Sequence, residues 1–156
     1  MKEVAILLLV ALMLNGCGSN STPATTTTAS GNWQAEMAGG SGPDSGFSFI
    51  TTFTVGGDGS LSVSYFQFLN SNSGQCFPVS GGTQTGTMVL TSSGSVVSGT
   101  FSFVVQSGNN TLTLTGVVTG TANGTTLTAT SITGTWALTG DAGCTGSSGT
   151  FTMTKS

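Results

Sequence analysis

The chain has 156 residues, and Thr, Ser and Gly account for 29, 22 and 25 of them. Two residues are basic, five are acidic, and neither Arg nor His occurs. This composition excludes a basic patch for nucleic acid, and it removes the imidazole that most zinc, haem and acid–base sites use. We therefore expect no nucleic-acid partner, no metal, no cofactor, no catalytic residues and no enzymatic activity.

Residues 1–16 are typical of an export signal. Lys2 precedes an unbroken apolar run over residues 4–14, which suits a secretory signal peptide and is too short for a membrane span of about 20 residues. The run ends in Leu14-Asn15-Gly16-Cys17. This motif resembles the lipobox of bacterial lipoproteins, Leu-x-[Gly/Ala/Ser]-Cys, although Asn15 departs from the small or apolar residue usual at its place.

The lipobox resemblance implies that Cys17 is diacylated and becomes the mature N-terminus. Two acyl chains would anchor the exported protein to a membrane of the cell envelope, at about 0.8 kcal/mol per buried methylene group. Gly18 stands where Asp would favour the inner membrane, which implies the outer membrane if the host has one. The alternative is an ordinary signal peptide that leaves Cys17 as a thiol.

Residues 17–30 are expected to form the lipidated cysteine and a tether. Apart from Pro23, Ala24 and Ala29, the residues after Cys17 are Ser, Thr, Asn and Gly, which cannot bury an apolar face. A first strand made of Thr is the alternative. The folded domain then covers residues 31–156, a single domain by size.

Apolar residues alternate with Ser and Thr along this domain, which predicts β-strands with one buried face. Turn-forming pairs such as Asn123-Gly124 separate the alternating stretches. We expect eight strands, over residues 31–38, 46–55, 60–69, 83–91, 96–106, 110–121, 125–138 and 149–155. Long strands joined by short hairpins predict an all-β fold, an antiparallel up-and-down meander closed or nearly closed into a barrel.

A short pattern, [Ser/Thr]-Gly-Thr-apolar, occurs five times, with its glycines at positions 86, 99, 120, 134 and 149. One glycine at a similar place in each strand would relax the backbone where a barrel strand bends sharply. The alternative is that abundant Gly and Thr produce such tetrads by composition alone.

Cys76 and Cys144 remain as an even pair in an exported chain, a setting in which disulfides form. We expect a structural disulfide between them, with Cα atoms about 4.4–6.8 Å apart. Two buried free thiols are the alternative. Neither cysteine has another Cys or a His nearby in the sequence, so a metal site is not expected.

The first expected strand opens with Gly31-Asn32-Trp33, which resembles the Gly-x-Trp motif of lipocalins; avidins begin with a similar strand. In lipocalins this Trp closes one end of the barrel against a basic side chain from the end of the fold, a place that the resemblance implies for Lys155. The chain as a whole resembles uncharacterised bacterial envelope lipoproteins that combine Gly-x-Trp, two Cys and a terminal Gly-Thr-Phe-Thr. That family implies no activity.

Three functions remain open at this point. The first is a monomeric envelope lipoprotein with a structural or surface-interaction role and a protein partner not specified by the sequence. The second is a carrier of small apolar ligands, whose calyx would be lined by Trp33, Phe47, Phe49, Tyr65, Phe101, Phe103 and Trp136. The third is a water- or ice-binding face built from Thr rows such as Thr111, Thr113 and Thr115, which the uneven spacing of the repeats disfavours.

The apolar content favours the first function. The domain holds 34 large apolar residues (Val, Leu, Ile, Met, Phe, Trp and Tyr), close to the number of inward positions that eight strands offer. We therefore expect a filled interior, with at most a shallow pocket at one open end. A glycosidase pair of Glu36 and Asp44 is disfavoured, because carboxylates near a turn are solvated.

Overall fold

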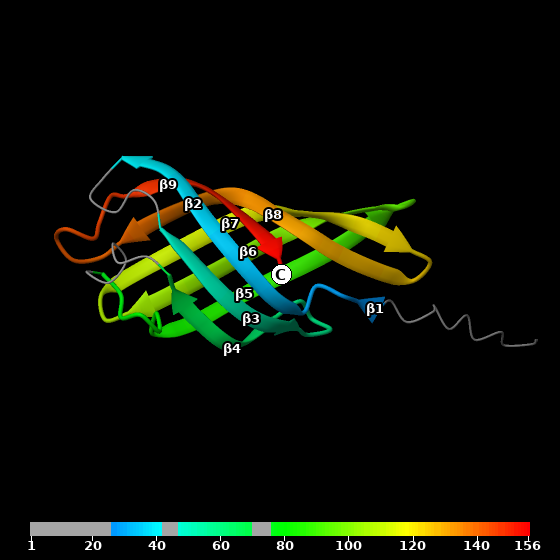
Figure 1. The fold of residues 1–156 in the computed structure, drawn as a ribbon, viewed down its shortest axis with the longest axis horizontal. Coiled ribbons are helices and arrows are strands. Elements are labelled where there is room, and N and C mark those ends of the chain that lie inside the picture. Colours follow the sequence, from blue (N-terminus) through cyan, green and yellow to red (C-terminus); the bar gives the residue numbers. More distant parts are fainter. Residues whose placement is uncertain (1–25, 42–46, 70–75) are drawn as a thin grey trace, which may run out of the picture.

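The computed structural model describes residues 26–41, 47–69 and 76–156, and these residues form nine strands (Figure 1). The strands are β1 (Thr26–Thr27), β2 (Gly31–Ser41), β3 (Ser48–Val55), β4 (Leu61–Phe68), β5 (Thr83–Ser93), β6 (Val96–Ser107), β7 (Asn110–Asn123), β8 (Thr126–Thr139) and β9 (Ser148–Lys155). Each of the eight expected strands corresponds to one of β2–β9, with ends that differ by at most three residues. Residues 26–41, 47–69 and 76–156 contain no helical segment with the length and hydropathy of a membrane span.

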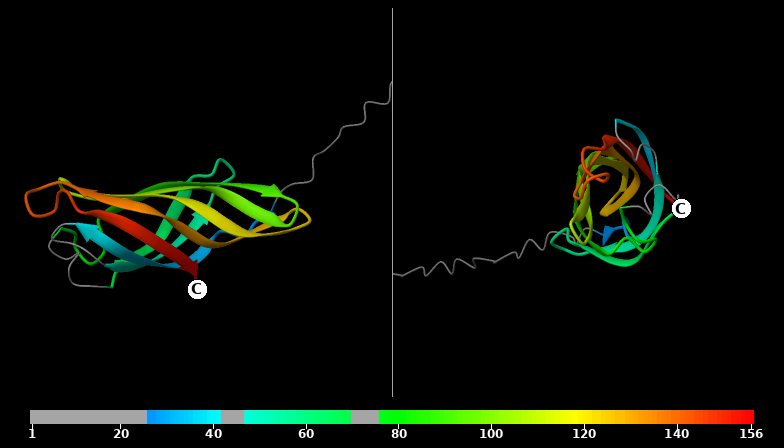
Figure 2. Two further views of the ribbon diagram at one scale, coloured as in Figure 1. Left: turned by 90° about the horizontal axis from the view of Figure 1, so that it is seen from above. Right: turned by 90° about the vertical axis from the view of Figure 1, so that its left-hand side faces the viewer.

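Strands β2–β9 form an antiparallel meander that curls into a barrel (Figure 2). Their order in the sheet is β4-β3-β2-β9-β8-β7-β6-β5, so the first long strand pairs with the last. The seam between β4 and β5 is not sealed along its length. It is held by hydrogen bonds from the Met88 N–H to the Gly59 carbonyl (2.7 Å) and from the Phe68 N–H to the Val79 carbonyl (2.9 Å). The expected all-β, nearly closed barrel is thus confirmed.

The two ends of the barrel differ (Figure 1). Strand β1 and the β3–β4, β5–β6 and β7–β8 hairpins lie at one end, which we call the β1 end. The other end carries the β4–β5, β6–β7 and β8–β9 connections, and we call it the disulfide end because Cys76 and Cys144 are bonded there. The chain therefore enters the barrel at the β1 end.

Strand β1 lies within residues 17–30, which were expected to form a tether, and it matches the alternative of a first strand made of Thr. It pairs in parallel with Thr126 and Leu127 at the start of β8. Strand β9 pairs with β8 only from Ser131 onward, so it leaves this part of β8 uncovered. The backbone N–H groups of Thr26 and Thr28 donate to carbonyls of β8 and the preceding turn, and Ala29 is fully buried. Residues 26–30 thus pack as part of the barrel, because β9 is too short to cover the edge of β8 at this end.

The glycines of the repeated tetrads face the barrel interior, and several lie directly opposite an aromatic residue on the next strand. Gly86 pairs with Phe103, Gly134 with Phe151, and Gly149 with Trp136. A glycine outside the tetrads, Gly116, likewise pairs with Phe101. Each missing side chain leaves room for the ring across from it, so small and large residues interdigitate inside a narrow barrel.

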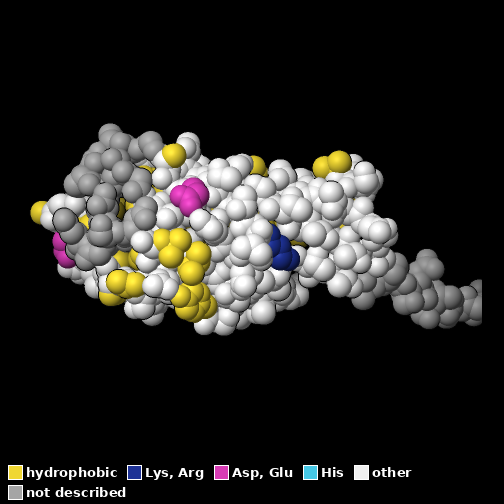
Figure 3. Space-filling view, in the orientation of Figure 1, with side chains coloured by type: hydrophobic (Ala, Val, Ile, Leu, Met, Phe, Trp, Pro, Cys, Tyr) yellow, Lys and Arg dark blue, Asp and Glu magenta, His cyan; other side chains and the backbone are white. Residues whose placement is uncertain are grey.

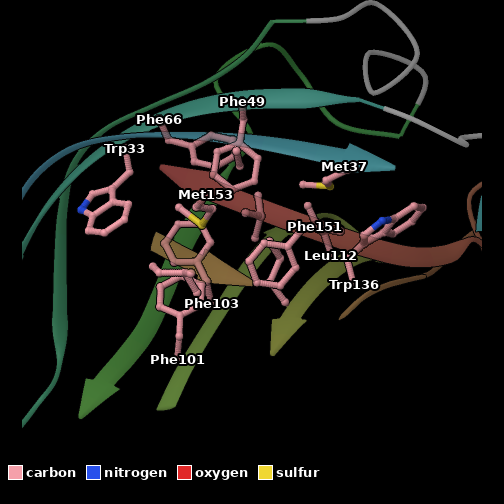
Figure 4. Packing of buried hydrophobic residues seen from close by; sticks show 14 of the residues in the cluster. Trp33, Met37, Phe49, Phe66, Phe101, Phe103, Leu112, Trp136, Phe151 and Met153 are labelled. Atoms are coloured by element: carbon pink, nitrogen blue, oxygen red, sulfur yellow. The ribbon is translucent and has the colours of Figure 1, made fainter. Parts of the chain in front are cut away.

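Aromatic rings fill the resulting interior (Figure 4). Near the middle, Phe49 and Phe66 lie with ring centroids 4.8 Å apart, and both stack on Phe103, at 6.0 and 5.9 Å. Towards the disulfide end, Phe47 packs edge-on against Trp136 at 5.3 Å. Ring pairs at these separations are favourable beyond the area they bury, so the core is a continuous packed column.

Candidate functional site

Six of the seven residues expected to line a calyx are instead part of this packed core. Trp33, Phe47, Phe49, Phe101, Phe103 and Trp136 each expose 3% or less of their surface. They contact one another rather than surround a void; Phe101 and Phe103, for example, lie 6.1 Å apart and nearly parallel. The three pockets described below include none of Phe47, Phe49, Phe101, Phe103 and Trp136 among their lining residues.

Tyr65, the seventh expected lining residue, points outward and is 46% exposed. The reason is a β-bulge between β3 and β4. Thr52 pairs with Tyr65 but the next residue, Phe53, pairs with Val63, so Ser64 is an extra residue in β4. The extra residue reverses the side of the sheet that the following residues face. Tyr65 is therefore a surface residue, and Phe66 and Phe68 take the interior positions.

Trp33 closes the core at the β1 end. Its ring stacks on Phe53, with centroids 6.0 Å apart and planes 7° apart, and its indole N–H donates to the carbonyl of Ala29 (2.9 Å). Lys155 is the direct partner of Trp33 in the β2–β9 ladder, and its ammonium group donates to the carbonyl of Thr28. Trp33 and Lys155 together hold residues 28 and 29 across this end.

The disulfide expected from the sequence joins the β4–β5 and β8–β9 connections. The Cα atoms of Cys76 and Cys144 are 5.6 Å apart, within the expected range. Asn110 ties the same two connections together, because its Nδ2 donates to the carbonyl of Cys76 (2.9 Å) and its Oδ1 accepts the N–H of Asp141 (2.9 Å). Closing a loop of 68 residues stabilises the fold by about 4 kcal/mol on the chain-entropy model.

A pocket of about 560 Å³ opens at the β1 end. Its apolar wall comes from Val55, Met88, Val89, Leu90 and Leu127, and the β3–β4 turn, residues 56–59, forms its rim. Asp58 on this rim is fully exposed, and its Oδ1 accepts hydrogen bonds from the hydroxyl (2.6 Å) and the N–H (3.0 Å) of Ser60. These bonds hold the pKa of Asp58 below its usual value, so the rim carries a negative charge at neutral pH.

The acidic residues that the structure describes are bound to local polar groups. Glu36 accepts a hydrogen bond from Gln34 (2.7 Å), and Asp141 accepts one from Asn109 (3.0 Å). Asp44, the other half of the glycosidase pair considered above, lies outside the described residues, as does Cys17. Within the part of the chain that the structure describes, no three His, Cys, Asp or Glu side chains gather closely enough to hold a metal ion.

Two surface depressions flank Tyr65: the smaller lies on the outer face of β2 and β3, and the larger lies between β4 and residues 79–80 of the β4–β5 connection. One, of about 190 Å³, is bordered by Asn32, Ile50 and Thr52, and the other, of about 400 Å³, by Phe66, Gln67, Val79 and Ser80. Together with the pocket at the β1 end, they are the candidate binding features of the described surface. Comparison of the chain with protein-family models, with curated proteins and with solved structures found no match.

Proposed function

We propose that the chain is a lipid-anchored protein of the cell envelope whose barrel is a rigid scaffold with a structural or surface-interaction role. The filled core carries this proposal. Aromatic rings occupy the interior from Trp33 at one end to Trp136 at the other, and these two Trp side chains are at most 1% exposed. A barrel whose interior is filled by side chains has its outer surface left for contacts.

The anchor rests on Leu14-Asn15-Gly16-Cys17 and on the direction of the chain. Residues 18–25 separate Cys17 from β1, and eight residues span at most roughly 29 Å. An acylated Cys17 would therefore hold the β1 end towards the membrane and leave the disulfide end facing away from it. The disulfide suits the oxidising compartment that such an exported protein would occupy.

The anchor is tested by Cys17→Ser. We expect the wild-type protein to sediment with membranes after a high-salt wash and the variant to move to the soluble fraction, because acyl chains are its proposed membrane attachment. Ser19→Ala is the matched control and should stay with the membranes. A Cys17→Ser protein that still sediments, or a wild-type protein that is already soluble, would overturn the anchor.

A second candidate function, a carrier of small apolar ligands, is favoured by one observation, the pocket of about 560 Å³ at the β1 end. Its volume is in the range of ligand pockets. The binding residues would then be Val55, Met88, Leu90 and Leu127, and not the seven expected from the sequence. Titration with an apolar fluorescent probe separates this candidate from the filled scaffold.

A further inference from the structure

Tyr65 is the one aromatic residue that the fold leaves on the surface. All nine Phe and both Trp of the chain are buried, whereas Tyr65, its single tyrosine, is 46% exposed. Figure 3 shows apolar side chains gathered over the β3 and β4 side of the barrel, on a surface that is otherwise mostly neutral and polar. An exposed tyrosine gives a binding surface a large, rigid ring at a low cost in conformational entropy.

Amide and hydroxyl side chains surround this ring in two rows across the strands. One row runs Asn32, Thr52, Tyr65, and the next runs Gln34, Ile50, Gln67. The Tyr65 hydroxyl donates to Oε1 of Gln67, and the Thr52 hydroxyl donates to Oδ1 of Asn32 (2.8 Å). These two bonds orient the amides and use their oxygens, while the Nδ2 of Asn32 and the Nε2 of Gln67 donate to no group within the described residues.

No Lys, Arg, Asp or Glu side chain lines the two depressions on either side of Tyr65, and Ser156 borders the smaller one. Lys155 lines neither depression, and its ammonium group donates to the carbonyl of Thr28 at the β1 end, so their lining offers no cation to an anionic ligand. The outer face of β5–β8 offers mainly Thr, Ser and Val side chains, together with Gln106 and Ala137, and no aromatic ring. The surface around Tyr65 therefore combines an aromatic ring for stacking with uncharged hydrogen-bonding groups, and the outer face of β5–β8 does not.

We propose that the outer face of β2–β4 around Tyr65 binds a neutral chain of hexopyranose units. A pyranose ring has an apolar face of C–H groups, which stacks on an aromatic ring, and a rim of hydroxyls, which accept hydrogen bonds from amides such as those of Asn32 and Gln67. The depressions on both sides of Tyr65 extend this contact beyond one sugar unit. This proposal rests on the surface-interaction role proposed above and names its partner class, a neutral polysaccharide. It does not depend on the lipid anchor.

Because the chain has one tyrosine, ring-¹³C tyrosine labelling of the full-length protein places a single reporter at the proposed site. The probes are cellotetraose, maltotetraose and chitotetraose, each titrated to 10 mM in detergent micelles. We expect at least one of them to shift the Tyr65 ring signals in a saturable way. If none does, the proposal is wrong.

Variants then separate stacking from a structural effect, with calorimetry of the bound tetrasaccharide as the readout. Tyr65→Ala should weaken binding at least about tenfold, Tyr65→Phe should keep most of it, and Asn32→Ala and Gln67→Ala should each weaken it. Val117→Ala, at an exposed position on β7, is the matched control and should bind as the wild type does. Binding that survives Tyr65→Ala would overturn the proposal, as would a ring shift produced by an extended peptide but by none of the sugars.

The sugar test and the anchor test fail independently. Loss of membrane attachment in Cys17→Ser leaves the surface around Tyr65 intact, so sugar binding should persist in that variant. A sugar-binding protein that is not acylated would remove the anchor and keep the glycan site. An anchored protein whose Tyr65 signals do not respond would do the reverse.

Discussion

Gly134→Ala is expected to lower the free energy of unfolding by at least about 3 kcal/mol, or to prevent folding. Gly134 pairs with Gly116 between β8 and β7 and faces the interior. A Cβ atom at Gly134 would lie 2.0 Å from the carbonyl oxygen of Thr115 and 2.5 Å from the Cα of Gly116. Both neighbours are backbone atoms, so no side-chain rotation relieves the overlap, and the two strands would have to separate.

Gly57→Ala is the matched control for this prediction. No atom lies within 4 Å of a Cβ built at Gly57, and its φ is not in the left-handed region. The free energy of unfolding of Gly57→Ala should stay within about 0.5 kcal/mol of the wild-type value. Urea unfolding of the three proteins, followed by tryptophan fluorescence, gives the comparison. Equal stabilities for Gly134→Ala and Gly57→Ala would show that the strands do not approach as closely as described.

Trp33→Ala is expected to lower the free energy of unfolding by about 3–5 kcal/mol. The substitution removes a fully buried ring and its stacking on Phe53, and it leaves a cavity beneath Ala29. It also leaves the carbonyl of Ala29 without its indole donor. Because Ala29 precedes β2, we expect β1 to lose its docking on β8, which hydrogen exchange at Thr26 and Thr28 would detect.

Phenylalanine substitutions separate packing from hydrogen bonding. Trp33→Phe keeps a ring but loses the hydrogen bond to Ala29. It should lower the free energy of unfolding by about 1–3 kcal/mol more than the smaller ring alone would. Trp136→Phe is the matched control, because the Trp136 indole N–H is buried and has no hydrogen-bond partner among the residues that the structure describes. A larger loss of stability for Trp136→Phe than for Trp33→Phe would contradict the role given to the Ala29 carbonyl.

The alternation of apolar and polar residues was sufficient to predict β2–β9, since each strand buries one face of a single barrel. Strand β1 could not be predicted in this way. It has two residues, both Thr, and its partners Thr126 and Leu127 lie about 100 residues further along the chain. Nothing local marks Thr26 and Thr27 as a strand; they are ordered by the edge of β8 that β9 leaves uncovered.

The place of Tyr65 was missed although the sequence carries a signal for it. Leu61 and Val63 share one parity, and Phe66 and Phe68 share the other, so no single alternation can bury both pairs. An extra residue between them, Ser64 in the structure, resolves the conflict. Strand β8 contains the same signal, since Leu127 and Ala129 face inward before a register shift and Ile132 after it. A change of parity within one strand therefore predicts a bulge.

The position of the seam and of the pocket could not be predicted from local patterns. Both depend on the long connection between β4 and β5, which starts after Phe68 and ends before Thr83. A hairpin would have continued the ladder from β4 to β5, whereas this connection leaves their facing edges joined near Gly59 and Val79. The pocket at the β1 end opens beside one of these joints, lined by residues 56–59 and 88–92.

The filled interior is tested most directly by titrating the full-length protein with apolar fluorescent probes. Two are used: 1-anilinonaphthalene-8-sulfonate, which carries a charged group, and N-phenyl-1-naphthylamine, which is uncharged. We predict no saturable site with a dissociation constant below about 10 μM, an affinity of roughly −7 kcal/mol. Leu127→Trp, which would fill the pocket at the β1 end, should leave the weak binding unchanged. Tight stoichiometric binding that Leu127→Trp abolishes would contradict the filled scaffold and establish a carrier.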